Sequence, residues 1–152
     1  MTWMKWRRLL QGIVASLVVL VLLVALGGPW LLYGIGLANI KGRPELAKRS
    51  ATVAEMQAVW ARHHGVGEPV VDVLSPYEYI LEIVRNTPAK HQPGQSIAWF
   101  VAARYNADHL VNHQTLRWHL SGACLIIWLT RHWSTGQILS KAVELGDARS
   151  RG

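Results

Sequence analysis

A long uncharged run near the N-terminus restricts the fold more than any other feature of this sequence. No Asp, Glu, Lys or Arg lies between Leu9 and Ile40, and residues 13–26 (IVASLVVLVLLVAL) are almost wholly aliphatic. An α-helix needs about 20 predominantly apolar residues to cross the roughly 30 Å hydrocarbon core of a bilayer. We therefore expect residues 9–40 to form one transmembrane anchor.

The residues around this run indicate its orientation. Lys5, Arg7 and Arg8 precede it, and the positive-inside rule retains such residues in the cytoplasm. Aromatic residues lie where the two interfacial belts of a membrane helix are expected: Trp3, Trp6, Trp30 and Tyr33. We expect residues 1–8 to be cytoplasmic and the chain after the anchor to lie outside the cytoplasm.

A cleaved signal peptide is the alternative interpretation of this run. The small residues around Gly36, Leu37 and Ala38 have a cleavable spacing. However, the run is longer than the roughly 7–15 residues of a signal-peptide core, which favours a permanent anchor. A buried core helix is disfavoured because so small a domain cannot cover an apolar helix on all sides.

A basic segment, residues 41–50 (KGRPELAKRS), follows the anchor. Its cations are Lys41, Arg43, Lys48 and Arg49. Because Pro44 disfavours a helix at the preceding residue, we expect a juxtamembrane connector. The positive-inside rule disfavours such cations on the outer side of a membrane, so they either contact lipid head groups or argue against this orientation.

Composition excludes several classes of protein. With 51% hydrophobic and 16% charged residues, the chain does not have the composition of a disordered protein. Its single cysteine, Cys124, excludes an internal disulfide and a Cys-rich zinc site. The net charge of +7 is spread along the chain and much of it flanks the anchor, so we expect no nucleic-acid partner. No cofactor is expected.

Three capping boxes divide the rest of the chain. In a capping box, the side chains of a Ser or Thr and of a Glu or Gln three residues later accept hydrogen bonds from free N–H groups at a helix start. The three are Thr52–Glu55, Ser75–Glu78 and Ser134–Gln137. They predict helices over residues 53–64, 76–86 and 135–145, and Gly65 and Gly146 are expected to end the first and the last.

Two more helices are expected between these, over residues 96–110 and 116–131. The apolar run Ala123–Leu129 is too short to cross a membrane and predicts a buried central helix, in which Cys124 is a small hydrophobe. Residues 69–74 are expected to be extended and residues 86–95 to form a loop. The sequence thus predicts an all-α domain over residues 51–146, followed by a tail, 147–152.

Histidines offer little metal chemistry. His109 and His113 have the i, i+4 spacing of a shared metal site, but Asp108 is the only acidic residue close to them in sequence. We interpret them as ordinary surface or capping residues and expect no metal site. His63 and His64 precede Gly65, where a helix C-terminus favours cations.

Residues 96–105 (SIAWFVAARY) and 116–139 resemble the second half of the peptidoglycan glycosyltransferase domain. This lysozyme-like module of penicillin-binding proteins and monofunctional transglycosylases polymerises the lipid-linked precursor lipid II. Residues 133–139 (WSTGQIL) are similar to the family's W-S-K-x-x-I-L-E type of turn, and a single N-terminal membrane helix is typical of the family. The resemblance covers less than a third of the chain. It implies a lysozyme-like domain on the outer side of a bacterial inner membrane, with a lipid-linked peptidoglycan precursor or a glycan strand as ligand.

The functional side chains of the family are largely replaced in this sequence. Apolar residues around Trp99 and Phe100 replace the polar groups with which the family holds a pyrophosphate. Counting back from the turn, the second functional Glu falls on Gly122. The resemblance leaves Arg104, Arg117 and His119 as candidate ligand-binding cations.

The first catalytic Glu of the family, in its E-D-x-x-F-x-x-H-x-G motif, falls on Met56. The neighbouring Glu55 is therefore one candidate base. Glu78 and Glu82, four residues apart on one expected helix face, are the others, although such a pair more often marks a solvated surface. Inverting glycosyl transfer needs a carboxylate that deprotonates the attacking hydroxyl and cations that stabilise the leaving pyrophosphate.

We expect a non-catalytic binding or regulatory module in cell-wall biogenesis, because the base is missing from its family position. Two alternatives stay open. One is an interaction subunit of a membrane protein complex that binds no glycan and uses exposed Trp residues for partner contact. The other is an active glycosyltransferase with relocated carboxylates.

Overall fold

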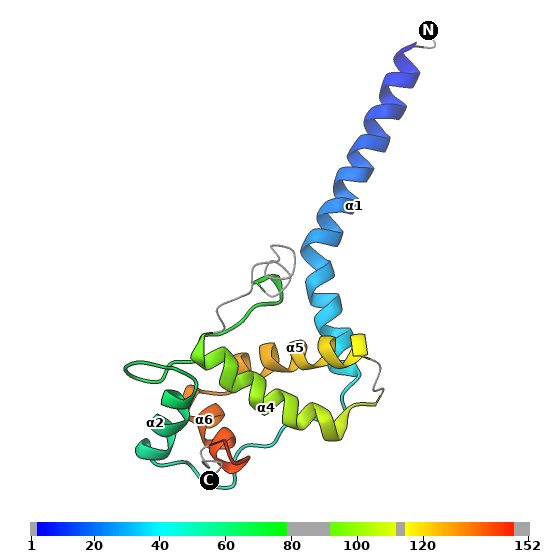
Figure 1. The fold of residues 1–152 in the computed structure, drawn as a ribbon. Helices are drawn as coiled ribbons and strands as arrows, with labels where there is room; N and C mark the ends of the chain where they lie inside the picture. The colour runs from blue at the N-terminus through cyan, green and yellow to red at the C-terminus, as the bar shows by residue number, and fades with distance from the viewer. Residues whose placement is uncertain (1–2, 79–91, 112–114, 148–152) are drawn as a thin grey trace. The chain divides into compact units, whose positions relative to one another are not determined.

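The computed structural model describes residues 3–78, 92–111 and 115–147, and this part of the chain is all-helical (Figure 1). Its helices are α1 (Trp3–Ala38), α2 (Val53–Arg62), α4 (Pro93–His109), α5 (Thr115–His132) and α6 (Thr135–Glu144). No β-strand occurs among these residues, so the predicted all-α class is confirmed there. A single antiparallel bridge joins Ile40 and Leu110. The chain divides into two compact units, Met1–Leu32 and Tyr33–Gly152.

The first unit consists of most of α1. Residues Leu10–Ala38 are long and apolar enough to cross a membrane, which confirms the prediction of one long apolar N-terminal helix. The aliphatic side chains from Leu10 to Leu26 are exposed. Pro29 lies inside the helix, where its ring removes one backbone hydrogen-bond donor.

All three predicted capping boxes are formed. The N–H of Glu55 donates to Thr52 Oγ1 at 3.3 Å, and the N–H of Thr52 donates to the Glu55 carboxylate at 2.8 Å. The same reciprocal bonds occur at the other two boxes: Ser75 with Glu78, and Ser134 with Gln137. The helix that begins after Ser75 is described only for residues 76–78. Its predicted end lies outside the described residues.

Helix α6 ends as predicted, whereas α2 does not. Gly146 takes a left-handed φ of 90° after α6. Helix α2 ends at Arg62, two residues before the predicted end at 64, and the left-handed residue after it is His64, with φ 63°. Gly65 meets a different requirement, because a Cβ there would lie 2.3 Å from Trp60 Cε2. The buried indole of Trp60 packs over the turn and excludes any side chain at this position.

Helix α4 begins earlier than predicted, at Pro93 rather than at Ser96, because proline suits the first turn of a helix. The earlier part of the predicted loop, residues 86–91, lies outside the described residues. Residues 69–74 have no regular secondary structure and no partner strand. The N–H groups of Val71 and Leu74 instead donate at 3.1 Å to the hydroxyls of Thr135 and Thr130. This segment is therefore attached to α5 and α6.

Helix α5 is the buried centre of the second unit, as the sequence predicts. Residues 121–127 are all buried, and the core around them includes Ile97 from α4 and Ile138 from α6. Desolvation raises the pKa of the Cys124 thiol to about 12. Cys124 therefore remains protonated at neutral pH and serves as a small hydrophobe.

The last turns of α1 belong to this second unit. Gly36 is buried against α5, where a Cβ would lie 2.4 Å from Cys124 Sγ. The Asn39 side chain then donates to Ser121 Oγ at 3.1 Å. The sequence placed residues 33–40 in the anchor alone, but they are also a structural part of the domain.

Backbone hydrogen bonds continue this attachment directly after α1. The N–H of Lys41 donates to the His109 carbonyl at 2.9 Å, and the N–H of Val111 donates to the Asn39 carbonyl at 3.0 Å. We call this pairing of residues 39–41 with 109–111 the exit pairing. It fixes the point at which the chain leaves α1.

A methyl group at Gly36 tests the contact between α1 and α5. We expect Gly36→Ala to lower the free energy of unfolding by about 1–3 kcal/mol, because overpacking forces neighbouring groups apart. Gly34→Ala is the matched control, since a Cβ at Gly34 meets nothing within 4 Å. Chemical denaturation of the detergent-solubilised protein, followed by near-UV circular dichroism, measures both variants. Equal stability of the two variants would contradict the close contact, and Cys124→Ala should partly rescue Gly36→Ala.

Candidate ligand groove and carboxylates

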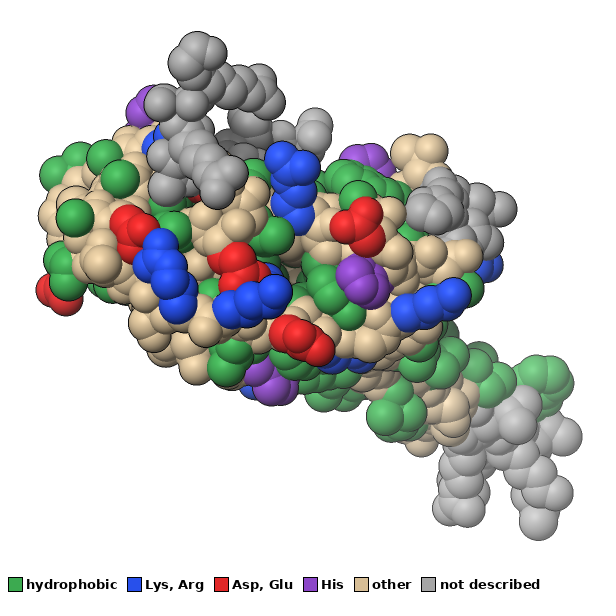
Figure 2. Space-filling model, turned by 90° about the horizontal axis from the view of Figure 1, so that it is seen from below, with side chains coloured by type: hydrophobic (Ala, Val, Ile, Leu, Met, Phe, Trp, Pro, Cys, Tyr) green, Lys and Arg blue, Asp and Glu red, His purple; other side chains and the backbone are tan. Residues whose placement is uncertain are grey.

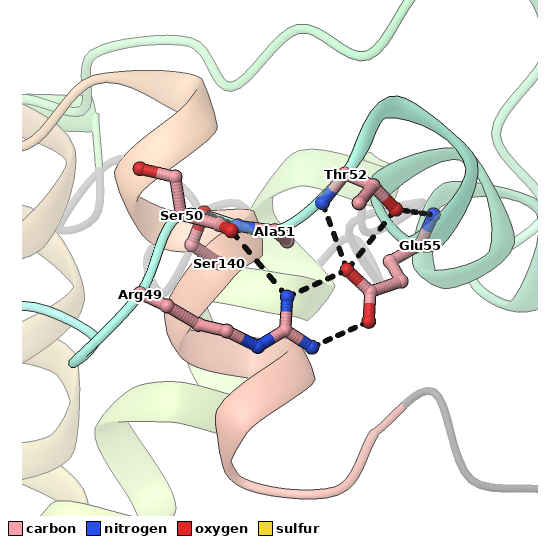
Figure 3. Close-up of polar contacts among 6 residues, drawn as sticks. All are labelled: Arg49, Ser50, Ala51, Thr52, Glu55 and Ser140. Carbon is pink, nitrogen blue, oxygen red and sulfur yellow. Dashed lines mark hydrogen bonds and ion pairs between the residues drawn. The ribbon is translucent and has the colours of Figure 1, made fainter.

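Glu55, the candidate base nearest to the family position, is held by several hydrogen bonds (Figure 3). Its Oε1 lies 2.6 Å from Arg49 Nη2, and its Oε2 accepts from Arg49 Nη1 at 2.9 Å. The same Oε2 accepts from the N–H and hydroxyl of Thr52 at 2.8 and 3.1 Å. Both carboxylate oxygens are therefore engaged in starting α2.

These contacts strongly lower the basicity of Glu55. The side-chain hydrogen bonds from Arg49 and the backbone hydrogen bond from Thr52 lower the pKa of this carboxyl to about 2. A general base works best when its pKa lies near the operating pH. Glu55 is ionised at neutral pH, but it is a poor proton acceptor.

The connector that carries Arg49 is attached to α6. The N–H of Ala51 donates to Ser140 Oγ at 2.9 Å, a contact that Figure 3 places beside the Arg49–Glu55 pair. The N–H of Lys48 donates to the Glu144 carboxylate at 2.6 Å. The side-chain hydrogen bond from Lys141 and the backbone hydrogen bond from Lys48 lower the pKa of the Glu144 carboxyl. Residues 48–51 are thus held by polar contacts with the domain.

Of the other two candidate carboxylates, the structure describes only Glu78. Glu78 is exposed, and its carboxylate accepts from the Ser75 N–H at 2.8 Å as a second helix cap. Glu82 lies outside the described residues. Among the residues that the structure describes, no group of three His, Cys, Asp or Glu side chains could hold a metal ion.

The three candidate cations occupy two helices, α4 and α5. Arg104 is exposed on α4, with its guanidinium 5.5 Å from the centre of the Phe100 ring. Arg117 and His119 are exposed in the first turns of α5. The His119 ring meets Trp118 edge-on, with the ring centres 5.0 Å apart.

Arg104 lines a hollow of 540 Å³ between the connector, α4 and α6. Its charged side chains are Arg43, Glu45, Arg104, Asp108 and Lys141. We call this hollow the connector groove. Its volume falls in the range of about 300–1,000 Å³ that is usual for small-molecule sites. Arg117 and His119 are not among its lining residues.

Charges of both signs are interspersed on the surface. On the face drawn in Figure 2, Lys and Arg side chains alternate with Asp and Glu, and no block of one sign covers it. The connector groove likewise combines three cations with two carboxylates. Such a lining suits a ligand that carries an anionic group together with hydrogen-bond donors.

One wall of the connector groove is held rigidly. The Tyr105 hydroxyl donates to the Lys41 carbonyl at 2.9 Å, and its ring stacks on His109 with centres 3.8 Å apart. His109 Nδ1 also lies 3.0 Å from the Tyr105 carbonyl oxygen. Gly42 has φ 72° and faces Tyr105, because a Cβ would lie 3.1 Å from the phenolic oxygen. His109 therefore supports this wall, while His113, four residues further along the chain, lies outside the described residues.

Sequence reasoning found Arg104 but not the groove around it. Arg43 belongs to the basic segment that was assigned to lipid contact, and Asp108 was considered only beside a histidine pair. Lys141 lies on α6, far from both in sequence. No spacing rule connects the three residues, since only the tertiary packing of α4, α6 and the connector brings them together.

Comparisons with known proteins add no relative. No protein-family model, curated protein or solved structure matches this chain. The likeness of residues 96–139 to peptidoglycan glycosyltransferases thus rests on the sequence pattern alone.

The pH dependence of stability tests the Glu55 cap. Its folded-state pKa of about 2 lies below the unfolded value of about 4.3, so ionised Glu55 stabilises the fold above that unfolded value. We expect this contribution to be lost as the pH falls from about 5 towards 2. Urea unfolding across this range, with NMR titration of the Glu55 carboxyl, measures it.

Arg49→Gln is the diagnostic variant for this cap. It should raise the Glu55 pKa towards its ordinary value and flatten the acid-side loss of stability. Glu55→Gln, which can still accept the Thr52 N–H, should remove the same pH dependence while α2 stays helical. An unchanged Glu55 titration in Arg49→Gln would contradict the ion pair.

Proposed function

We propose that this chain is a membrane-anchored, non-catalytic binding or regulatory module of the bacterial cell envelope, related to the peptidoglycan glycosyltransferases. The engagement of Glu55 as a helix cap is the observation that carries this proposal. Met56, at the family position of the catalytic Glu, has a thioether that cannot accept a proton at neutral pH. The candidate nearest to that position is a carboxylate with a pKa of about 2 and both oxygens bonded.

The proposed ligand is the lipid-linked peptidoglycan precursor or a glycan strand that bears anionic groups. Arg43, Arg104 and Lys141 supply cations in one groove, and Arg guanidinium groups match phosphate oxygens with paired N–H donors. Tyr105 holds the connector beside them through the Lys41 carbonyl. The groove is therefore partly organised before a ligand arrives.

The proposed location is the inner membrane, with α1 as an uncleaved single-pass anchor and the domain on the periplasmic or extracytoplasmic side. Buried contacts at the end of α1 support the uncleaved form. A signal-peptide cleavage near Ala38 would remove Gly36 and Leu37, which are both buried in the domain. Lys5, Arg7 and Arg8 before the apolar run support the orientation.

The alternative of an interaction subunit without a glycan ligand has less support. It relied on exposed Trp residues for partner contact. The exposed tryptophans among the described residues are Trp3, Trp6 and Trp30, all on α1. The described tryptophans of the domain are buried or half-buried.

Binding of lipid II to the purified full chain in detergent tests the proposed ligand. We expect Arg104→Gln with Lys141→Gln to weaken binding by at least about tenfold, which corresponds to about 1.4 kcal/mol. Arg62→Gln, an exposed cation on α2 outside the groove, is the matched control and should bind as the unaltered protein does. Equal affinity of the groove variant and the control would overturn the groove as the site.

Polymerisation of lipid II tests the absence of catalysis. We expect no glycan product from the unaltered protein and none from Glu55→Ala, because neither offers a base of suitable pKa. Turnover that disappears in Glu55→Ala would overturn the non-catalytic assignment. Isolation of a stoichiometric protein partner, together with no retention of lipid II, would favour the interaction subunit instead.

A further inference from the structure

Two exposed apolar side chains lie at the corner where α4 gives way to α5. Val111 is 57% exposed and Leu116, in the first turn of α5, is 80% exposed. Single exposed apolar residues are common, and this domain has others, such as Val66 at 91%. Exposure alone therefore assigns no role to Val111 and Leu116.

Their attachment to the end of α1 distinguishes these two residues. Ala38 is the last residue of the helix that is able to cross a membrane, and Asn39 follows it. The Val111 N–H donates to the Asn39 carbonyl, and Ile40 pairs with Leu110. The exit pairing thus holds Val111 beside Asn39, which is the first residue after the membrane-competent helix.

The chemistry around this corner suits a bilayer interface. Arg117 follows Leu116 directly and is exposed, and Lys41, in the other segment of the exit pairing, is also exposed. Half-buried Trp118 comes next on α5. Aliphatic side chains, tryptophan and cations together favour the boundary between acyl chains and phosphate head groups.

We propose that Val111, Leu116 and Arg117, here called the exit corner, dock on the same bilayer that α1 crosses. Val111 and Leu116 enter the acyl boundary, while Arg117 and Lys41 meet the lipid phosphates. This inference rests on the proposed membrane anchor. It gives the domain a second attachment to the membrane, on the side where a lipid-linked ligand would be presented.

Depth-dependent fluorescence quenching tests the exit corner in the full chain, reconstituted into nanodiscs with acyl-brominated anionic lipids. An environment-sensitive thiol probe is placed at Leu116→Cys, at Val66→Cys and at Leu20→Cys in separate samples. Cys124 is buried with a pKa of about 12, so the unaltered protein should take no label and serves as the blank. We expect about twofold or greater quenching at positions 116 and 20 and none at position 66.

The three positions separate the possible failures. Quenching at 20 with none at 116 overturns the exit corner and leaves the anchor intact. No quenching at 20 or 116 overturns the anchor and this inference together. Equal quenching at 116 and 66 also overturns the exit corner, because the domain then meets lipid over a broader or different face.

A charged variant with its own control completes the test. Val111→Asp, with the probe at 116, should abolish the quenching at 116. Because the exit pairing uses only backbone groups, the circular dichroism spectrum and the thermal unfolding midpoint should stay the same. Val66→Asp should leave quenching at 116 unchanged. Undiminished quenching in Val111→Asp would overturn insertion of this corner.

Discussion

The contact between Gly36 and Cys124 brings the backbone of α1 against the side of α5, and much of the second unit follows from it. With no side chain at position 36, the last turns of α1 can pack on the buried helix at the centre of the domain. Asn39 then reaches Ser121, and the exit pairing joins the next residues to the end of α4. The start of the connector is fixed in this way.

The connector illustrates how a cluster of cations can serve the fold. Its cations resemble a solvated or lipid-facing cluster in the sequence. In the structure, Arg49 holds Glu55 at the start of α2, and Arg43 lines a groove with Arg104 and Lys141. The Lys48 and Ala51 N–H groups bond to side chains of α6. A segment without regular secondary structure thereby positions much of the candidate site.

Local features of the fold were predictable, and tertiary ones were not. The capping boxes and the burial of α5 follow from residues a few positions apart, so the sequence alone contains their cause. The requirement for glycine at position 65 depends instead on Trp60, whose indole occupies the space beside it. The point at which α1 joins the second unit was equally hidden, because lipid and a protein core favour the same apolar residues.

In the candidate site, too, single residues were predictable from the sequence, whereas their contacts were not. Arg104 was found through a sequence resemblance, but its neighbours Asp108 and Lys141 come together only when α4 packs beside α6. The role of Glu55 was also undetermined, because the sequence is compatible with Glu55 either as part of a capping box or as a catalytic base. Its bonds to Arg49 and Thr52 decide between these roles.

Pro29 gives α1 a mechanical property that its apolar composition hides. It cannot donate the backbone hydrogen bond that would reach the carbonyl of Ala25, so the helix resists bending least at this point. The second unit begins shortly afterwards, at Tyr33. In the proposed membrane anchor, a bilayer of different thickness that tilts the span would be accommodated by curvature at Pro29, and the contact of Gly36 with Cys124 would be spared the strain.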